Sequence, residues 1–157
     1  MTHITTYRSC KPYSYRADSR VLAFPDDRPI IVFDGVCIFC SGFIKFVLRH
    51  DKSEKFRFVT AQSALGQALY QHYRLDTQVF ETNLVIVDGR LHTKLDAFVQ
   101  VMKRLPMPWP LFAVLQVLPR FLADRLYDVI ARNRYRLFGR TEDCMVPPPR
   151  MQTRFLG

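Results

Sequence analysis

The sequence is poor in cysteine and has no long apolar run. Its four cysteines in 157 residues are too few for the disulfide framework of a small secreted domain. The most apolar stretch, residues 109–118, is about half as long as a bilayer-spanning helix. The first residues lack the apolar segment of a secretory signal peptide. We therefore expect a cytoplasmic protein, in a compartment that keeps thiols reduced.

The pattern of a metal site is also missing. A structural zinc site usually needs four ligands, often as two closely spaced pairs, and the chain has a single CxxC. The histidines are scattered singly along the chain, as His3, His50, His72 and His92. Half of a zinc site remains an alternative for the CxxC, which elemental analysis of the protein would test. We expect no metal and no cofactor.

No nucleic-acid-binding motif accompanies the net charge of +9, so we expect no nucleic-acid partner. The excess lies at the C-terminal end, where residues 103–157 carry ten basic and four acidic residues. The densest basic cluster consists of Arg132, Arg134, Arg136 and Arg140. It is either a solvated helix face or a surface for an acidic partner or an anionic membrane.

Apolar periodicity predicts an α/β domain over residues 29–147, after an irregular leader (1–28) and before a tail (148–157). Three consecutive prolines, residues 147–149, are predicted to end the regular structure. The predicted strands are 30–34, 56–59, 84–87 and 90–94, and the predicted helices are 38–50, 61–73, 96–105, 111–118 and a long one from Pro119 to about Arg136.

The last two helices are predicted to pack on the domain. Residues 111–118 are interpreted as a buried or docking helix, with an interfacial membrane segment as the alternative. In the long helix after Pro119, five apolar residues are predicted to face the core: Phe121, Leu122, Leu126, Val129 and Ile130.

Cys37 and Cys40 follow the first strand and a tight turn, and both of their sulfurs are expected in the first turn of the first helix. In the first helical turn, unpaired backbone N–H groups and the helix dipole stabilise a thiolate, and cysteines in such places have pKa values of about 3.5–7.5. We expect Cys37, at a solvent-facing edge, to attack as a thiolate. Cys40, one turn on, would then resolve the mixed disulfide.

Three further residues are candidates for supporting roles. Asp34 could accept a proton from Cys40, raise the thiol pKa by charge repulsion, or form an Asx-type turn or helix cap. Gly35 is expected to give the turn backbone freedom. Cys144 is either a third thiol near the site or a small buried apolar residue.

Residues 34–40, which read Asp-Gly-Val-Cys-Ile-Phe-Cys, resemble the DGxCxxC signature of the DCC family of predicted thiol–disulfide oxidoreductases. Residues 135–140, followed by Cys144 and Pro147, are similar to that family's C-terminal block, and the Val-Asp-Gly hairpin at 87–89 also fits. The resemblance implies a thioredoxin-like, three-layer α/β/α fold with extra C-terminal helices, and dithiol chemistry. It also implies that Arg136 and Arg140 could hold Asp34 or the Cys144 loop in place.

One feature departs from thioredoxins, which carry a cis-proline before the strand that faces the CxxC. The corresponding residues here, 81–83, contain no proline. This difference favours a dedicated partner or a small thiol as the substrate. Two functions therefore remain open: a thiol–disulfide oxidoreductase acting on a protein or small-molecule thiol or disulfide, and a non-catalytic interaction or membrane-surface adaptor with a basic C-terminal face.

Overall fold

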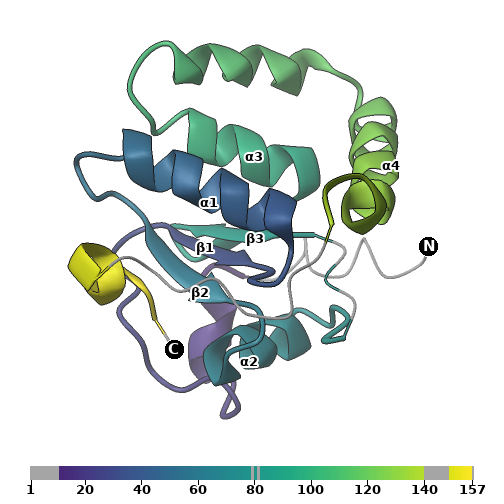
Figure 1. The fold of residues 1–157 in the computed structure, drawn as a ribbon. Coiled ribbons are helices and arrows are strands. Elements are labelled where there is room, and N and C mark those ends of the chain that lie inside the picture. Colours follow the sequence, from purple (N-terminus) through teal and green to yellow (C-terminus); the bar gives the residue numbers. More distant parts are fainter. Residues whose placement is uncertain (1–10, 79, 81, 140–148, 157) are drawn as a thin grey trace.

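The computed structural model describes residues 11–78, 80, 82–139 and 149–156 (Figure 1). Four strands form one mixed sheet in the order β2-β1-β3-β4. They are β1 (Ile30–Phe33), β2 (Arg57–Thr60), β3 (Leu84–Val87) and β4 (Arg90–Thr93). β1 pairs with β2 in parallel and with β3 antiparallel, and β3 and β4 form an antiparallel hairpin. The predicted α/β class is confirmed, and the topology is consistent with a thioredoxin-like fold.

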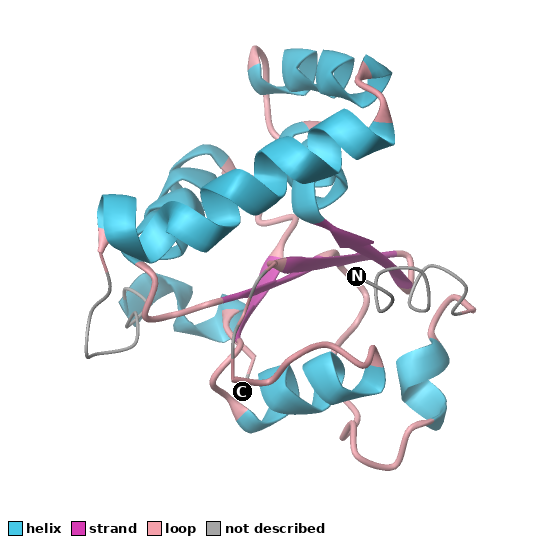
Figure 2. Ribbon diagram, turned by 90° about the vertical axis from the view of Figure 1, so that its right-hand side faces the viewer, coloured by secondary structure: helices cyan, strands magenta, loops and turns pink. Residues whose placement is uncertain are grey.

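Helices cover both faces of this sheet, which gives three layers. α1 (Ile38–His50) and α3 (Lys94–Met102) lie on one face, and α2 (Ala64–His72) lies on the other (Figure 1). A 3₁₀ helix, η3 (Trp109–Val117), leads to the long α4 (Arg120–Phe138). η3 lies beyond α3 on the side away from the sheet (Figure 2), whereas α4 lies beside the ends of α1 and α3 (Figure 1). The predicted strands and helices are present, with ends that differ by up to three residues.

The apolar run of β1 is fully buried because both of its faces meet a core. Ile31 and Phe33 face the core under α1 and α3, and Ile30 and Val32 face the core over α2. Alternate side chains of a strand point to opposite faces, so a strand covered on both sides needs a continuous apolar sequence. The central position of β1 fixes the place where the chain leaves the sheet toward Cys37.

The leader is held against the domain by aromatic side chains. Asp88 and Gly89 have positive φ angles of 50° and 74°, as the tight β3–β4 hairpin turn requires, and Tyr13 donates its backbone N–H to the Gly89 carbonyl at 2.9 Å. Tyr15 is buried, and its hydroxyl donates to Asp26 at 2.9 Å. Residues 11–18 are thus part of the packed structure.

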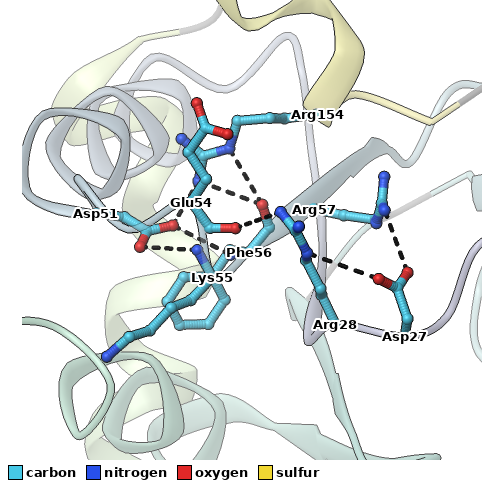
Figure 3. Close-up of polar contacts among 8 residues, drawn as sticks. All are labelled: Asp27, Arg28, Asp51, Glu54, Lys55, Phe56, Arg57 and Arg154. Atoms are coloured by element: carbon cyan, nitrogen blue, oxygen red, sulfur yellow. Dashed lines mark hydrogen bonds and ion pairs between the residues drawn. The ribbon is translucent and has the colours of Figure 1, made fainter.

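The prediction that regular structure ends at the triple proline is wrong. A 3₁₀ helix, η4 (Pro149–Arg154), follows, and the Leu156 N–H donates to the Phe58 carbonyl at 2.7 Å beside β2. Phe155 forms a parallel bridge with Phe58 and stacks on its ring. Arg154 forms a buried ion pair with Asp51 (Figure 3). These partners are distant in sequence, so local patterns give no sign of them.

The predicted orientation of the long helix α4 is also wrong, whereas η3 packs against α3, as the docking alternative predicted. The five apolar residues of α4 expected in the core, Phe121, Leu122, Leu126, Val129 and Ile130, are all exposed. The inner side of α4 instead carries Ala123, Asp128, which pairs with Lys94 at 2.8 Å, and Tyr135. In η3, no residue is fully buried, although Trp109 packs edge-on against Phe46.

Candidate active site

Cys37 is the N-cap residue of α1. Its backbone is extended, and its Sγ accepts a hydrogen bond from the Cys40 N–H at 3.4 Å. A side chain in this position satisfies one of the N–H groups that the first helical turn leaves unpaired. The sulfur therefore lies where the helix end favours negative charge, as the sequence predicts. Cys40 follows one turn later, and both residues are thiols.

The expectation that Cys37 faces solvent is wrong. Cys37 has 0% of its surface exposed and Cys40 has 2%, whereas the two residues between them, Ile38 and Phe39, are largely exposed. The helix begins with its cysteine side turned toward the sheet, so its first turn presents apolar side chains to the outside. Neither cysteine is therefore open to solvent in this structure.

Asp34 is fully buried directly below this turn. Its Oδ1 accepts hydrogen bonds from the Val36 N–H at 3.1 Å and from Gln62 Nε2 at 2.7 Å, and its Oδ2 accepts from the Tyr135 hydroxyl. The contact to Val36 is the Asx-type turn that the sequence offered as one role for Asp34. The Asp34 carbonyl also accepts from the Cys37 N–H at 3.3 Å, so this residue shapes the turn that places the cysteine.

Sequence reasoning missed Gln62 and Tyr135. β1 and β2 are parallel, with Phe33 beside Thr60, so the residues that follow these two strands meet at one edge of the sheet. Gln62 makes two hydrogen bonds from this position. Its Oε1 accepts from the Gly35 N–H at 3.0 Å, and its Nε2 donates to Asp34 Oδ1. The parallel pairing was the signal that could have found it.

Tyr135 connects the site to α4. Residue 135 is 101 positions from Asp34 in sequence, and α4 packs against α1. A Cβ atom on Gly139, just after α4, would lie 3.4 Å from Ile38 Cδ1, so the end of α4 lies against the first turn of α1. Tyr135 begins the C-terminal block that resembles the family, but nothing local indicated that its hydroxyl would reach Asp34.

The remaining supporting candidates have different positions. Arg136 is exposed, on the outer side of α4. Gly35 lies in the turn, where its carbonyl accepts from Ser41 Oγ at 3.2 Å. Cys144 and Arg140 lie outside the described residues, as does the side chain of Arg134. The structure thus brings together Asp34, Gly35 and the two cysteines.

The loop before β3 is held by hydrogen bonds at the place where thioredoxins have their cis-proline. Thr82 is buried there, its carbonyl accepts from the Tyr70 hydroxyl at 2.6 Å, and its Oγ1 accepts from the Lys94 N–H at 2.9 Å. Leu84 pairs with Val32, so this loop lies at the same end of the sheet as the cysteine turn. A threonine anchored from two helices thus fixes the loop.

The described residues contain no cluster of metal-ligating side chains, and their cavity lies away from the cysteines. Within the described ranges, no group of three or more His, Cys, Asp or Glu side chains is placed to hold a metal ion. An open cavity of about 690 Å³ lies between β4, α3 and the start of α4, lined by residues that include His92 and Arg120 but neither cysteine.

Comparison with known proteins identifies the family. Residues 31–140 match the model of the DCC1-like thiol-disulfide oxidoreductases. The chain belongs to this family. The matched residues include the whole described site from Asp34 to Tyr135, while η4 and Arg154 lie beyond them. No solved structure matches the chain.

Two relatives of the DCC1-like chain match most of its length. The uncharacterized protein YuxK of Bacillus subtilis (strain 168) is 37% identical over 127 residues, which cover 81% of this chain and 93% of YuxK. The chloroplastic DCC family protein At1g52590 of Arabidopsis thaliana is 38% identical over 120 residues, covering 76% of this chain and 70% of that protein. The resemblance seen in residues 34–40 is thus confirmed as family membership.

Proposed function

We propose that this DCC1-like protein exchanges a dithiol for a disulfide through Cys37 and Cys40. The observation that carries the proposal is the Cys37 Sγ at the N-cap of α1, accepting from the Cys40 N–H. A thiolate is the attacking species in thiol–disulfide exchange, and this position stabilises one. Family membership supports the same chemistry.

The reaction runs in two displacements. The Cys37 thiolate attacks one sulfur of a substrate disulfide, forms a mixed disulfide and releases the other substrate sulfur as a thiolate. The Cys40 thiolate then attacks the Cys37 sulfur and releases the second substrate sulfur. Two electrons pass to the substrate, which becomes a dithiol, and the protein is left with a Cys37–Cys40 disulfide. When the protein starts as the Cys37–Cys40 disulfide, a substrate dithiol takes the same steps in reverse: the substrate is oxidised to a disulfide, and Cys37 and Cys40 become thiols.

Asp34 is the group proposed to take the Cys40 proton in the second step. It is buried at the base of the turn, with its carboxylate held by Gln62 and Tyr135. A carboxylate kept in one orientation can act as a general base without reorganising, and the hydrogen bond from the Cys37 N–H to the Asp34 carbonyl puts this residue in the dithiol turn. Gln62 and Tyr135 are positioning residues in this scheme, since they act through Asp34.

The burial of both thiols bears on the substrate. A sulfur with no exposed surface does not meet a disulfide by simple collision, so the proposed substrate is a dedicated partner or a small thiol or disulfide that can displace the surroundings of Cys37. The cytoplasmic location expected from the cysteine content remains a prediction, and cell fractionation tests it.

Trapping of mixed disulfides tests the two roles. Cys40→Ser removes the resolving thiol, so we expect mixed disulfides with small disulfides or cellular partners to accumulate at Cys37. Cys37→Ser is the matched control and should accumulate none at Cys40. Equal trapping by both variants would contradict the assignment of nucleophile.

Alkylation of the reduced, folded protein gives a second readout. Peptide mass spectrometry after a brief treatment near neutral pH should find Cys37 labelled before Cys40, since both thiols are buried and Cys37 is the one at the helix N-cap. Faster labelling of Cys40 would overturn this order. A measured reduction potential would then distinguish an oxidant from a reductant, which differ by about 150 mV across this chemistry.

A further inference from the structure

Most of the large apolar side chains that are exposed in the described part of the chain lie on η3, on α4 or just before η3. The two most exposed residues of this set are Val117 (82%) and Phe121 (76%), which flank the short link between the helices. The others are Met107, Leu111, Phe112, Val114, Leu122, Leu126, Val129, Ile130 and Leu137. Exposed apolar side chains that gather on neighbouring helices, instead of being scattered singly, usually mark an interaction site. We call this set, together with the arginines described next, the η3–α4 surface.

The apolar and basic residues of α4 form two adjacent rows. Leu122, Leu126, Val129, Ile130 and Leu137 recur at intervals of three, four and seven, and therefore share one side of the helix. A second row, of exposed arginines with the same spacing, lies next to it and consists of Arg125, Arg132 and Arg136. The outer side of α4 is thus apolar along one half and basic along the other.

The acidic residues of α4 lie on its inner side. Asp128 pairs with Lys94, which is buried at the start of α3, and Asp124 lines the cavity between α3 and α4. The arginine row therefore has no acidic residue of its own helix on the outer side. The preceding segment, residues 105–119, contains no charged residue at all. Apart from the uncharged Gln116 and Asn133, the η3–α4 surface is apolar and cationic, and it carries no acidic residue.

We propose that the η3–α4 surface docks on an anionic lipid bilayer. An interfacial helix inserts an apolar side below the headgroups and keeps basic side chains at the level of the lipid phosphates. α4, 19 residues and about 28 Å long, has both components side by side. Val117 and Phe121 would enter the bilayer at the corner between the two helices.

The charges favour a bilayer over a second copy of this chain. Two copies that paired through α4 would bring their arginine rows close together, because the rows border the apolar side of each helix. Like charges in such an interface cost free energy, whereas anionic headgroups supply the complementary charge. The surface binds without spanning, since no helix in the described part of the chain is long and apolar enough to cross a membrane.

Co-sedimentation of the full chain with vesicles tests the proposal. We expect binding to vesicles of phosphatidylglycerol and phosphatidylcholine, weaker binding at high salt, and little binding to phosphatidylcholine alone. Phe121→Glu, and separately the double variant Arg125→Glu/Arg132→Glu, should each weaken binding to anionic vesicles about tenfold or more. Because these side chains are exposed, the melting temperature should stay near that of the wild type.

Matched controls separate the surface from general charge and apolarity. Leu22→Glu removes an equally exposed apolar residue (78%) outside the surface. Lys45→Glu/Arg49→Glu reverses two exposed charges on α1. Both controls should bind vesicles as the wild type does. The proposal is overturned if anionic vesicles do not sediment the protein, or if the controls lose as much binding as the test variants. It is also overturned if Phe121→Glu instead dissociates a dimer in light scattering while the wild type ignores vesicles.

Discussion

Replacing Arg154 with methionine tests how much the C-terminal segment contributes to the stability of the domain. Arg154 is buried, donates to Asp51 Oδ2, and makes two 3.2 Å contacts to the Phe56 carbonyl (Figure 3). Its guanidinium also lies 5.1 Å from the centre of the Phe58 ring. Methionine fills much of the same volume without the charge or the donors, so the variant isolates the polar contacts.

The expected loss follows from what remains around Asp51. Its carboxylate keeps two backbone donors, the N–H groups of Lys55 at 3.0 Å and Phe56 at 3.1 Å, but its counter-ion is gone. Removing one member of a buried ion pair costs about 3–5 kcal/mol. The retained donors place the loss near the lower end, about 3 kcal/mol. For a chain of this length, that lowers the melting temperature by about 6–12 °C.

Urea unfolding and thermal melts at neutral pH measure the loss. Arg150→Met is the matched control, since Arg150 is exposed in the same short helix, and it should change the free energy of unfolding by less than about 0.5 kcal/mol. Asp51→Asn combined with Arg154→Met should cost less than the sum of the single changes, because the two side chains interact. An Arg154→Met variant as stable as Arg150→Met would refute the reasoning.

Three further predictions concern the site and the leader. Tyr135→Phe removes a hydrogen-bond donor from the buried Asp34 carboxylate, so it should lower the free energy of unfolding in urea by about 1.5–3 kcal/mol. It should also slow thiol–disulfide exchange at Cys37 and Cys40. A variant with the stability and exchange rate of the wild type would contradict the contact. Gly66→Ala should cost about 1–3 kcal/mol, since the added carbon would lie 2.2 Å from a backbone carbonyl oxygen of β2, whereas Gly42→Ala, with nothing within 4 Å, should be neutral or stabilising in the same melts. The hydrogen bond from Arg16 lowers the pKa of Asp26. The contribution of Asp26 to the free energy of unfolding is therefore full above the unfolded pKa of about 3.9 and is lost at lower pH. The stability gap between wild type and Asp26→Asn should therefore be constant from neutral pH to about pH 5 and narrow below about pH 4; a gap that widens on acidification would show that the sign is wrong.

The sequence determined the order of the elements and the position of the dithiol because both depend on local patterns. A continuous apolar run predicted β1, and the CxxC at the start of an apolar-periodic segment predicted a cysteine at the N-cap of α1. The Asp-Gly pair at 88–89 predicted the β3–β4 turn, since both residues tolerate positive φ. In each case, neighbours in sequence decide the outcome.

Tertiary structure decided which side of α4 packs against the rest of the protein. Its apolar residues suggested a core-facing side, but the inner side is set by a Lys94–Asp128 ion pair and the Tyr135 contact to Asp34, which join distant elements. The burial of Cys37, the use of Gln62 and the ion pair of Arg154 were decided in the same way. Periodicity in the sequence shows that a helix has an apolar side. Whether that side is covered or exposed depends on contacts between residues that are far apart in the chain, by up to 103 positions.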